Sequence, residues 1–424
     1  MTDQENNAFT LKKNITLYQG IAALTSTLLG SGIFVVPAMT ATIAGNYSLL
    51  SWLLTIALII PVALTFGYLG SSYPNAGGTA YFVGRVFGKK SENFTSWLFL
   101  SVIPIGPPVV VITGASYLGS TFQGSNNQIF FISILMLLAM FAINLFSIEF
   151  TDKIQIILSC LITFVLISVI VLGLINSPIH NDVLKQSLAS ANIWRIGRCI
   201  TIIFWCFAGI ETVTHLSTEF KDVKKDFSRV IIISIFTVGL LYFLIAFVVI
   251  KHGAYGNEDK NINSLIYLTG TFIGSSGRYF VGLTGFFACF LTVNMYILSC
   301  SRLIYSMSVN KMLFRWFSRA THNGQLRNAL IATFILVTNT LIIKFIFQID
   351  LENLILYANG VFILIYLLTS IAGISLLQGH KRFIAIISSA LCFGLLLIMG
   401  RMAIFAIFIL IFSILYEYIS ERLR

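Results

Sequence analysis

The stretch Leu28–Pro37, which reads L-L-G-S-G-I-F-V-V-P, decides the fold because it places helix-breaking residues inside a long apolar run. Each glycine costs about 1 kcal/mol of helix propensity relative to alanine, and the proline cannot donate to the helical ladder. Gly30, Ser31 and Gly32 together therefore predict a break near the bilayer centre. Unpaired backbone at that depth is tolerated only where it is buried in protein or lines a cavity. The break is a candidate binding site; the alternative is that Gly-Ser-Gly lets a neighbouring helix approach closely.

The composition indicates an all-α integral membrane protein. Of 424 residues, 57% are hydrophobic and 10% are charged, and the mean hydropathy is +0.90. A helix needs roughly 20 apolar residues to cross the hydrocarbon core, and the runs lack the alternation of an outer-membrane barrel. Twelve such runs predict twelve transmembrane helices, at 15–38, 47–71, 94–118, 128–148, 154–176, 198–217, 229–250, 279–301, 328–347, 353–377, 383–399 and 402–418.

The placement of basic residues orients the chain. With the N-terminus in the cytoplasm, 19 of the 27 Lys and Arg residues fall in cytoplasmic loops, termini and adjoining helix ends, and 8 on the other side. This positive-inside bias predicts that both termini are cytoplasmic, and it explains the net charge of +11 without a nucleic-acid partner. The leader carries Asp3 and Glu5 and precedes an overlong apolar run, so no signal peptide is predicted.

The sixth run repeats the feature of the first. It reads C-I-T-I-I-F-W-C-F-A-G-I-E from Cys199, with a weak point in helix propensity at 207–209. A carboxylate at the bilayer centre costs at least ~2.5 kcal/mol, so Glu211 marks a functional-site hypothesis. His215 lies four residues on, on the same helix face, and is its predicted partner. The alternative is a buried Glu–His or Glu–backbone pair that only packs.

The two breaks lie five spans apart. Because five is odd, two five-helix units in series run in opposite directions, which is the signature of inverted-topology repeats around a transport site. The predicted organisation is a cytoplasmic leader at 1–14, a first repeat at 15–176, a second repeat at 198–377, two peripheral helices at 383–418 and a cytoplasmic tail at 419–424.

The backbone at the two breaks predicts the ligand. Unpaired N–H groups at the start of the outer half-helix of the first span favour a carboxylate. Free carbonyls at the second break favour an ammonium, so the pair suits a small zwitterion. The surrounding side chains are apolar, which predicts a neutral hydrophobic amino acid. The predicted binding residues are Leu28, Gly30, Ser31, Gly32, Ile33, Trp205, Phe207, Ala208 and Gly209, with Ile105, Val109 and Met295 in the pocket wall.

Several other segments carry structural expectations. The prolines of I-P-I-G-P-P at 103–108 predict a sharp bend in the third run. P-N-A-G-G after the second run predicts a cytoplasmic loop, the alternative being a re-entrant gate with Arg85 as a latch. The charged stretch 219–229 predicts a surface helix, and 251–278 predicts a short surface helix on the opposite side. Asn359-Gly360 in the tenth run is a third polar, flexible spot.

G-S-G-I-F at 30–34, P-N-A-G-G-x-x-Y at 74–81 and F-A-G-I-E at 207–211 together resemble the amino acid–polyamine–organocation (APC) superfamily. The resemblance spans essentially the whole chain and implies a LeuT-like 5+5 inverted-repeat core plus two peripheral helices. It implies substrate contacts at the first break and at the carbonyls of Trp205 and Ala208, with Phe207 as a gate. It also implies that Glu211 couples the two broken helices.

The third and tenth runs resemble, more narrowly, the methionine and branched-chain amino-acid exporters of that superfamily. The resemblance implies export of methionine, leucine, isoleucine and valine from a bacterium through its inner membrane, by proton antiport with alternating access. Some proton-coupled relatives carry a lysine in span five, but 157–163 has none, which leaves Glu211 or His215 to carry the proton. Glu211, His215 and Arg85 are thus the predicted coupling and gating residues.

Other function classes fit less well. Uptake or exchange by the same fold is the main alternative, because direction does not follow from the fold. An enzyme would need a nucleophile or metal ligands, and the five histidines are scattered without ligand spacing. The cysteines show no C-x-x-C pair. A channel would need a filter or a ring of charge. No cofactor or metal is predicted, and a proton gradient is the predicted energy source. The predicted partners are the amino acid and membrane lipid, and the prediction allows a homodimer.

Overall fold

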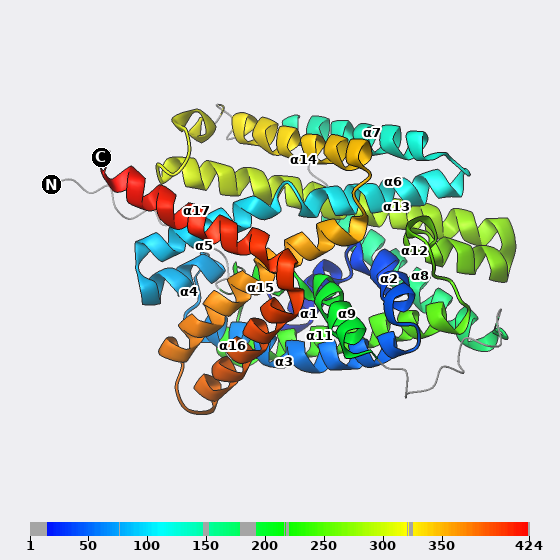
Figure 1. Cartoon of the computed structure of the whole chain (residues 1–424), viewed down its shortest axis with the longest axis horizontal. Helices are drawn as coiled ribbons and strands as arrows, with labels where there is room; N and C mark the ends of the chain where they lie inside the picture. Colours follow the sequence, from blue (N-terminus) through cyan, green and yellow to red (C-terminus); the bar gives the residue numbers. More distant parts are fainter. Residues whose placement is uncertain are drawn as a thin grey trace.

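The computed structural model describes residues 15–75, 77–146, 152–178, 192–215, 217, 220–319, 321 and 325–422, which form a bundle of α-helices without a strand among them (Figure 1). The helices are α1 (Leu17–Leu28), α2 (Gly32–Ala44), α3 (Tyr47–Ser72), α4 (Gly78–Phe87), α5 (Lys89–Val102), α6 (Gly106–Thr121), α7 (Asn126–Leu145), α8 (Asp152–Ile175), α9 (Ile193–Ile203), α10 (Ile210–His215), α11 (Val223–Lys251), α12 (Glu258–Ile262), α13 (Ser264–Val309), α14 (Arg327–Phe347), α15 (Leu351–Leu376), α16 (Gly379–Met399) and α17 (Ala403–Arg422). Short 3₁₀ turns lie at Phe204–Phe207, Arg315–Ser318 and Gly400–Met402.

The outward face of the bundle is apolar, which identifies its solvent as lipid. Phe131, Phe287 and Phe408 are 64%, 46% and 61% exposed, and a soluble protein rarely exposes so many large apolar side chains. Within the described residues, nine helical segments are long and apolar enough to cross a membrane, or ten when the bent pair α1–α2 is one span. The chain is therefore a multi-pass membrane protein.

Burial separates central helices from peripheral ones. In α15, 78% of the apolar window is buried, whereas only 22% is buried in α7 and in α14. Figure 1 shows α7 and α14 side by side along one edge of the bundle, with α1, α2 and α9 in its middle. The segment that contains α16 and α17 is 28% buried. The helix breaks described below belong to the central set.

The third span is interrupted at its prolines. Helix α5 ends at Val102 and α6 begins at Gly106, so the turn falls on I-P-I. Pro107 and Pro108 occupy the first turn of α6, where a missing N–H leaves no hydrogen bond unmade. The interruption is confirmed, whereas the predicted sharp bend is wrong: α5 and α6 together form one span, Lys89–Thr121, and α1–α2 is the one helix pair among the described residues that bends by more than 40° at its break.

Of the two surface helices predicted outside the spans, the structure contains one. The short helix predicted within 251–278 is confirmed as α12, which Asn257 caps by accepting a bond from the Lys260 N–H. The prediction of a separate surface helix at 219–229 is wrong. Asp222 is the N-cap of α11, which begins at Val223. Residues 223–229 form its first turns, so the charged stretch is the polar start of a membrane-length helix.

The segment after α3 is more ordered than a plain loop. The expected cytoplasmic loop contains the helix α4, ten residues long, which packs against α5 and α15. Thr79, Phe82 and Val83 are buried on one face of it. Apolar residues at helical spacing therefore drive this segment into the bundle, despite its flanking glycines and proline.

Candidate functional site

The first span is broken where Gly-Ser-Gly predicts. Helix α1 ends at Leu28 and α2 begins at Gly32, with a 50° bend between them. Ser31, which precedes α2, is buried and makes no side-chain cap to the N–H groups of α2. These N–H groups carry the positive end of the helix dipole. The start of α2 therefore has the electrostatics of an anion site.

The sixth span is broken over a longer stretch. After α9, a 3₁₀ turn covers Phe204–Phe207, and Ala208 is extended, with ψ of 129°. Gly209 then adopts φ of +121°, a conformation that favours glycine, and α10 begins at Ile210. The Ala208 N–H donates to the carbonyls of Phe204 and Trp205 at 3.1 and 3.3 Å. The predicted acceptor at Trp205 thus already receives one long bond and keeps a second lone pair.

The two breaks touch each other. A β-carbon built on Gly32 would lie 2.9 Å from Cys206 Sγ, and one on Gly209 would lie 3.3 Å from Thr27 Cγ2 and 3.8 Å from Leu28 Cδ2. The helix therefore breaks at Gly-Ser-Gly, and a neighbouring helix approaches closely at the same point. The interrupted segments of the first and sixth spans therefore pack against each other. The binding site at this break stays a prediction.

The third span, which holds two of the predicted wall residues, packs against the second break. A β-carbon on Gly106 would lie 3.7 Å from Trp205 Cη2, so the start of α6 lies against the break of the sixth span. The predicted wall residues Ile105 and Val109 are both buried. The predicted binding residues Leu28, Ile33 and Phe207 are also buried.

The contribution of α13 differs in detail from the expectation. Met295 is 54% exposed. The residue that meets the first break is Thr292, whose Cγ2 is 3.7 Å from the position of a β-carbon on Gly30. The sequence does not predict which face of α13 points to the centre of the bundle, because apolar residues occur on every face of the helix.

Glu211 is buried beside the second break. Its Oε2 accepts a hydrogen bond from the Gly209 N–H at 2.9 Å and another from the Tyr366 hydroxyl. Tyr366 is fully buried on α15. These contacts tie the carboxylate to the break of the sixth span and to α15. His215, its predicted partner, ends α10, and the side chain of that residue lies outside the described part of the chain.

Two residues at the breaks were not predicted to act there. Asn359 Nδ2 donates to the Thr201 carbonyl at 2.7 Å, which caps the carbonyl end of α9. Tyr242 donates from its hydroxyl to the Leu28 carbonyl at 3.1 Å, at the end of α1. The polar spot at Asn359-Gly360 was a usable signal. Tyr242 carried no signal, because it is one tyrosine inside an apolar run.

Arg85 makes local contacts at the surface. It is exposed on α4, with its guanidinium 4.9 Å from the centre of the Tyr73 ring and Nη1 donating to the Tyr81 hydroxyl at 2.8 Å. These contacts hold the residue beside α4 itself. Its predicted gating role stays a prediction.

Comparisons with known proteins agree with this geometry. A family model described as amino acid permease matches residues 15–419. The L-methionine/branched-chain amino acid exporter YjeH of Escherichia coli is 36% identical over 403 residues, which cover 94% of this chain and 95% of that protein. The uncharacterized amino acid permease YecA of Bacillus subtilis is 30% identical over 87% and 86% of the two chains. The serine/threonine exchanger SteT of Bacillus subtilis is 23% identical over 72% and 70%.

The match covers both helix breaks, the interruption of the third span and the helices that pack on them, so it includes every part of the candidate site. The relatives are permeases, exporters and exchangers. The chain therefore belongs to the amino acid permease family of the APC superfamily, and it is an amino acid transporter and not an enzyme.

Proposed function

We propose that this transporter exports neutral hydrophobic amino acids, namely methionine, leucine, isoleucine and valine, by proton antiport with alternating access. The observation that carries the proposal is the contact between the two helix breaks at Gly32 and Gly209. It gives a carboxylate the N–H groups of α2 and gives an ammonium the carbonyls near α10. The name of the Escherichia coli relative supports the substrates and the direction.

The contacts between helices support a 5+5 inverted repeat within twelve spans. Helices α3, α6 and α7 each pack against the helix five spans later, α11, α13 and α14 respectively. The pairs α1–α11 and α3–α9 are also equivalent under a shift of five spans, as are α6–α7 and α13–α14. A two-fold relation between the predicted repeats 15–176 and 198–377 accounts for all of these pairs.

The apolar lining supports a neutral, hydrophobic substrate. The buried wall consists of Leu28, Ile33, Trp205 and Val109, together with Ile105, and none of these side chains carries a charge. An arginine or glutamate substrate would need a buried counter-charge for its side chain. Burial against this wall favours methionine, leucine, isoleucine and valine by about 25 cal/mol for each Å² of apolar surface removed from water.

Glu211 is the proposed proton carrier. As a carboxylate it accepts the Gly209 N–H at the second break, and a protonated carboxyl is the weaker acceptor. Proton binding therefore loosens the backbone of the break, which links the proton to the helix that holds the substrate. One charge moved across 100 mV supplies about 2.3 kcal/mol, enough for roughly a fifty-fold gradient.

The proposed location is the bacterial inner membrane with both termini in the cytoplasm. The charge bias of 19 against 8 basic residues supports this orientation, and the bacterial relatives support the membrane. The homodimer stays a prediction, which the mass of the solubilised chain measured by light scattering would test.

The test uses proteoliposomes loaded with radiolabelled methionine. A proton gradient directed against the amino-acid flux should accelerate release of the label, and a protonophore should abolish the acceleration. Release that ignores the gradient would rule out proton antiport. Release that depends only on external amino acid would favour exchange, the activity in the name of the serine/threonine relative. Absence of any saturable flux of methionine or leucine would overturn the substrate class.

A further inference from the structure

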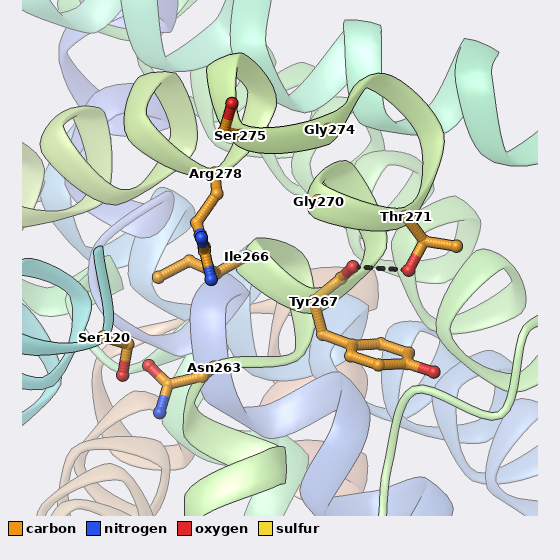
Figure 2. Close-up of a pocket in the computed structure, with 9 residues that line it drawn as sticks. All are labelled: Ser120, Asn263, Ile266, Tyr267, Gly270, Thr271, Gly274, Ser275 and Arg278. Carbon is orange, nitrogen blue, oxygen red and sulfur yellow. Dashed lines mark hydrogen bonds between the residues drawn. The ribbon is translucent and has the colours of Figure 1, made fainter. Parts of the chain in front are cut away.

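A cavity outside the helix breaks opens where α13 bends. The backbone leaves helical geometry at Ile273 and Gly274, and Gly274 has φ of +69°. The cavity measures about 390 Å³, within the range of small-molecule sites. It is lined by Ser120, Asn263, Ile266, Tyr267, Gly270, Thr271, Gly274, Ser275 and Arg278 (Figure 2).

Arg278 supplies a positive charge at one wall of the cavity. Figure 2 shows its side chain hanging from the turn of α13 after the bend towards Asn263 and Ser120. Its Nε is buried without a hydrogen-bond partner, and no carboxylate within the described residues forms an ion pair with it. A buried donor without a partner is costly, so the guanidinium offers a vacant donor to an anionic group.

Asn263 supplies an acceptor on the facing wall. Its Nδ2 donates to the Asp259 carbonyl at 2.9 Å, whereas its Oδ1 is buried without a partner. The Ser120 hydroxyl, from the end of α6, lies on the same side of the cavity in Figure 2. One wall therefore presents donors and the facing wall presents acceptors.

We propose that this cavity is a second amino-acid site. The α-carboxylate binds the Arg278 guanidinium in the bidentate geometry that arginine favours, and the ammonium binds Asn263 Oδ1 and Ser120 Oγ. Ile266 and Tyr267 lie beside the ligand side chain. The choice of an amino acid over another zwitterion rests on the proposed function.

The cavity is separate from the site at the helix breaks. Arg278 and Thr292 lie on the same helix, 14 residues apart in sequence, which corresponds to about 20 Å at 1.5 Å per residue. One amino acid cannot span both places, so the number of amino acids bound per chain tells whether both sites exist.

The test is equilibrium binding of tritiated leucine to the purified full-length chain in nanodiscs, at saturation. We expect two leucines per wild-type chain. Arg278→Ala should leave one, Gly32→Leu should leave one, and the double variant should bind none. Arg195→Ala is the matched control, because Arg195 is an exposed arginine of α9 outside the cavity, and it should leave two.

The ligand class is tested by competition at the remaining site of the Gly32→Leu variant. Leucine should compete at least tenfold better than 4-methylpentanoate, which lacks the ammonium, and than 3-methylbutylamine, which lacks the carboxylate. Equal competition by 4-methylpentanoate or by inorganic phosphate would overturn the zwitterion site in favour of a simple anion site. Asn263→Leu, which removes the acceptor but keeps the arginine, should erase leucine's advantage over 4-methylpentanoate.

The two proposals fail in different ways. A single leucine per wild-type chain that Gly32→Leu removes and Arg278→Ala leaves intact would overturn the second site and leave the proposed function standing. No leucine bound by a monodisperse wild-type chain would overturn the proposed function itself. Arg278→Lys checks for a folding defect, because it keeps the charge and should weaken the second site without removing the first.

Discussion

Substitution of Gly32 by alanine tests the contact on which the transport site depends. The added β-carbon would lie 2.9 Å from both Cys206 Sγ and Tyr242 Oη and 3.4 Å from Trp205 Cδ1. Both 2.9 Å separations are shorter than ordinary van der Waals contact, so α2 or the side chains of Cys206 and Tyr242 must shift. Overpacking of this kind costs about 1–3 kcal/mol.

The cost should appear in transport, because α2 carries the N–H groups proposed to hold the carboxylate. With a factor of ten for about 1.4 kcal/mol, kcat/KM for leucine counterflow in proteoliposomes should fall roughly 10- to 100-fold. Gly394→Ala in α16 is the control, since its β-carbon would meet no atom within 4 Å and the residue is not part of the predicted site. It should change kcat/KM by less than about threefold if packing alone decides.

A rescue experiment separates crowding from other effects. Cys206→Ala removes the sulfur that the new β-carbon would strike, so the double variant should recover part of the lost activity, with a coupling of about 0.5–3 kcal/mol. Counterflow at the wild-type rate by a monodisperse Gly32→Ala protein would refute the proposed contact and, with it, the site.

Three further predictions concern buried polar groups of the bundle. Glu211→Gln should flatten the pH dependence of transport, whereas Tyr366→Phe should lower the rate and keep a pH dependence; an unchanged profile in Glu211→Gln would move the proton elsewhere. Asn359→Leu should strand the carbonyl end of α9 and lower the stability by about 1–3 kcal/mol, measured by thermal unfolding in detergent, and an unchanged midpoint would show that its bond is dispensable. Burial and, less strongly, the adjacent Lys251 ammonium lower the pKa of His252, at the end of α11, below 6.5. As the pH falls, His252 therefore binds a proton in the unfolded chain before it does so in the folded one, and the free energy of unfolding should drop between about pH 7 and 5. The drop should be smaller in His252→Gln. An equal drop in that variant would assign the pH dependence to other groups.

His252 also shows how the structure joins distant spans. Its Nε2 lies 2.8 Å from the Gly173 carbonyl, and Lys251 Nζ donates to the carbonyls of Gly173, Leu174 and Asn176 at 2.9–3.0 Å. The end of α11 thus caps the end of α8. Sequence patterns gave no sign of this pairing, because both residues read as ordinary polar positions at a helix end.

The features that the sequence determined by itself are those set by local backbone chemistry. The membrane class follows from composition, and the breaks near 30–32 and at Gly209 follow from glycines, whose helix propensity is poor. The interruption of the third span follows from its prolines in the same way. Each depends on a few consecutive residues, so no partner helix is needed to predict it.

Only the tertiary structure decided which side chains meet at those breaks. In an apolar helix every face looks alike in sequence, so the rotation of α13 that places Thr292 at the first break and exposes Met295 is fixed by packing alone. The same is true of Asn359 on the carbonyl end of α9, since 158 residues separate it from Thr201. The position of a helix break depends on the local backbone, whereas the side chains that contact the break depend on how distant helices pack around it.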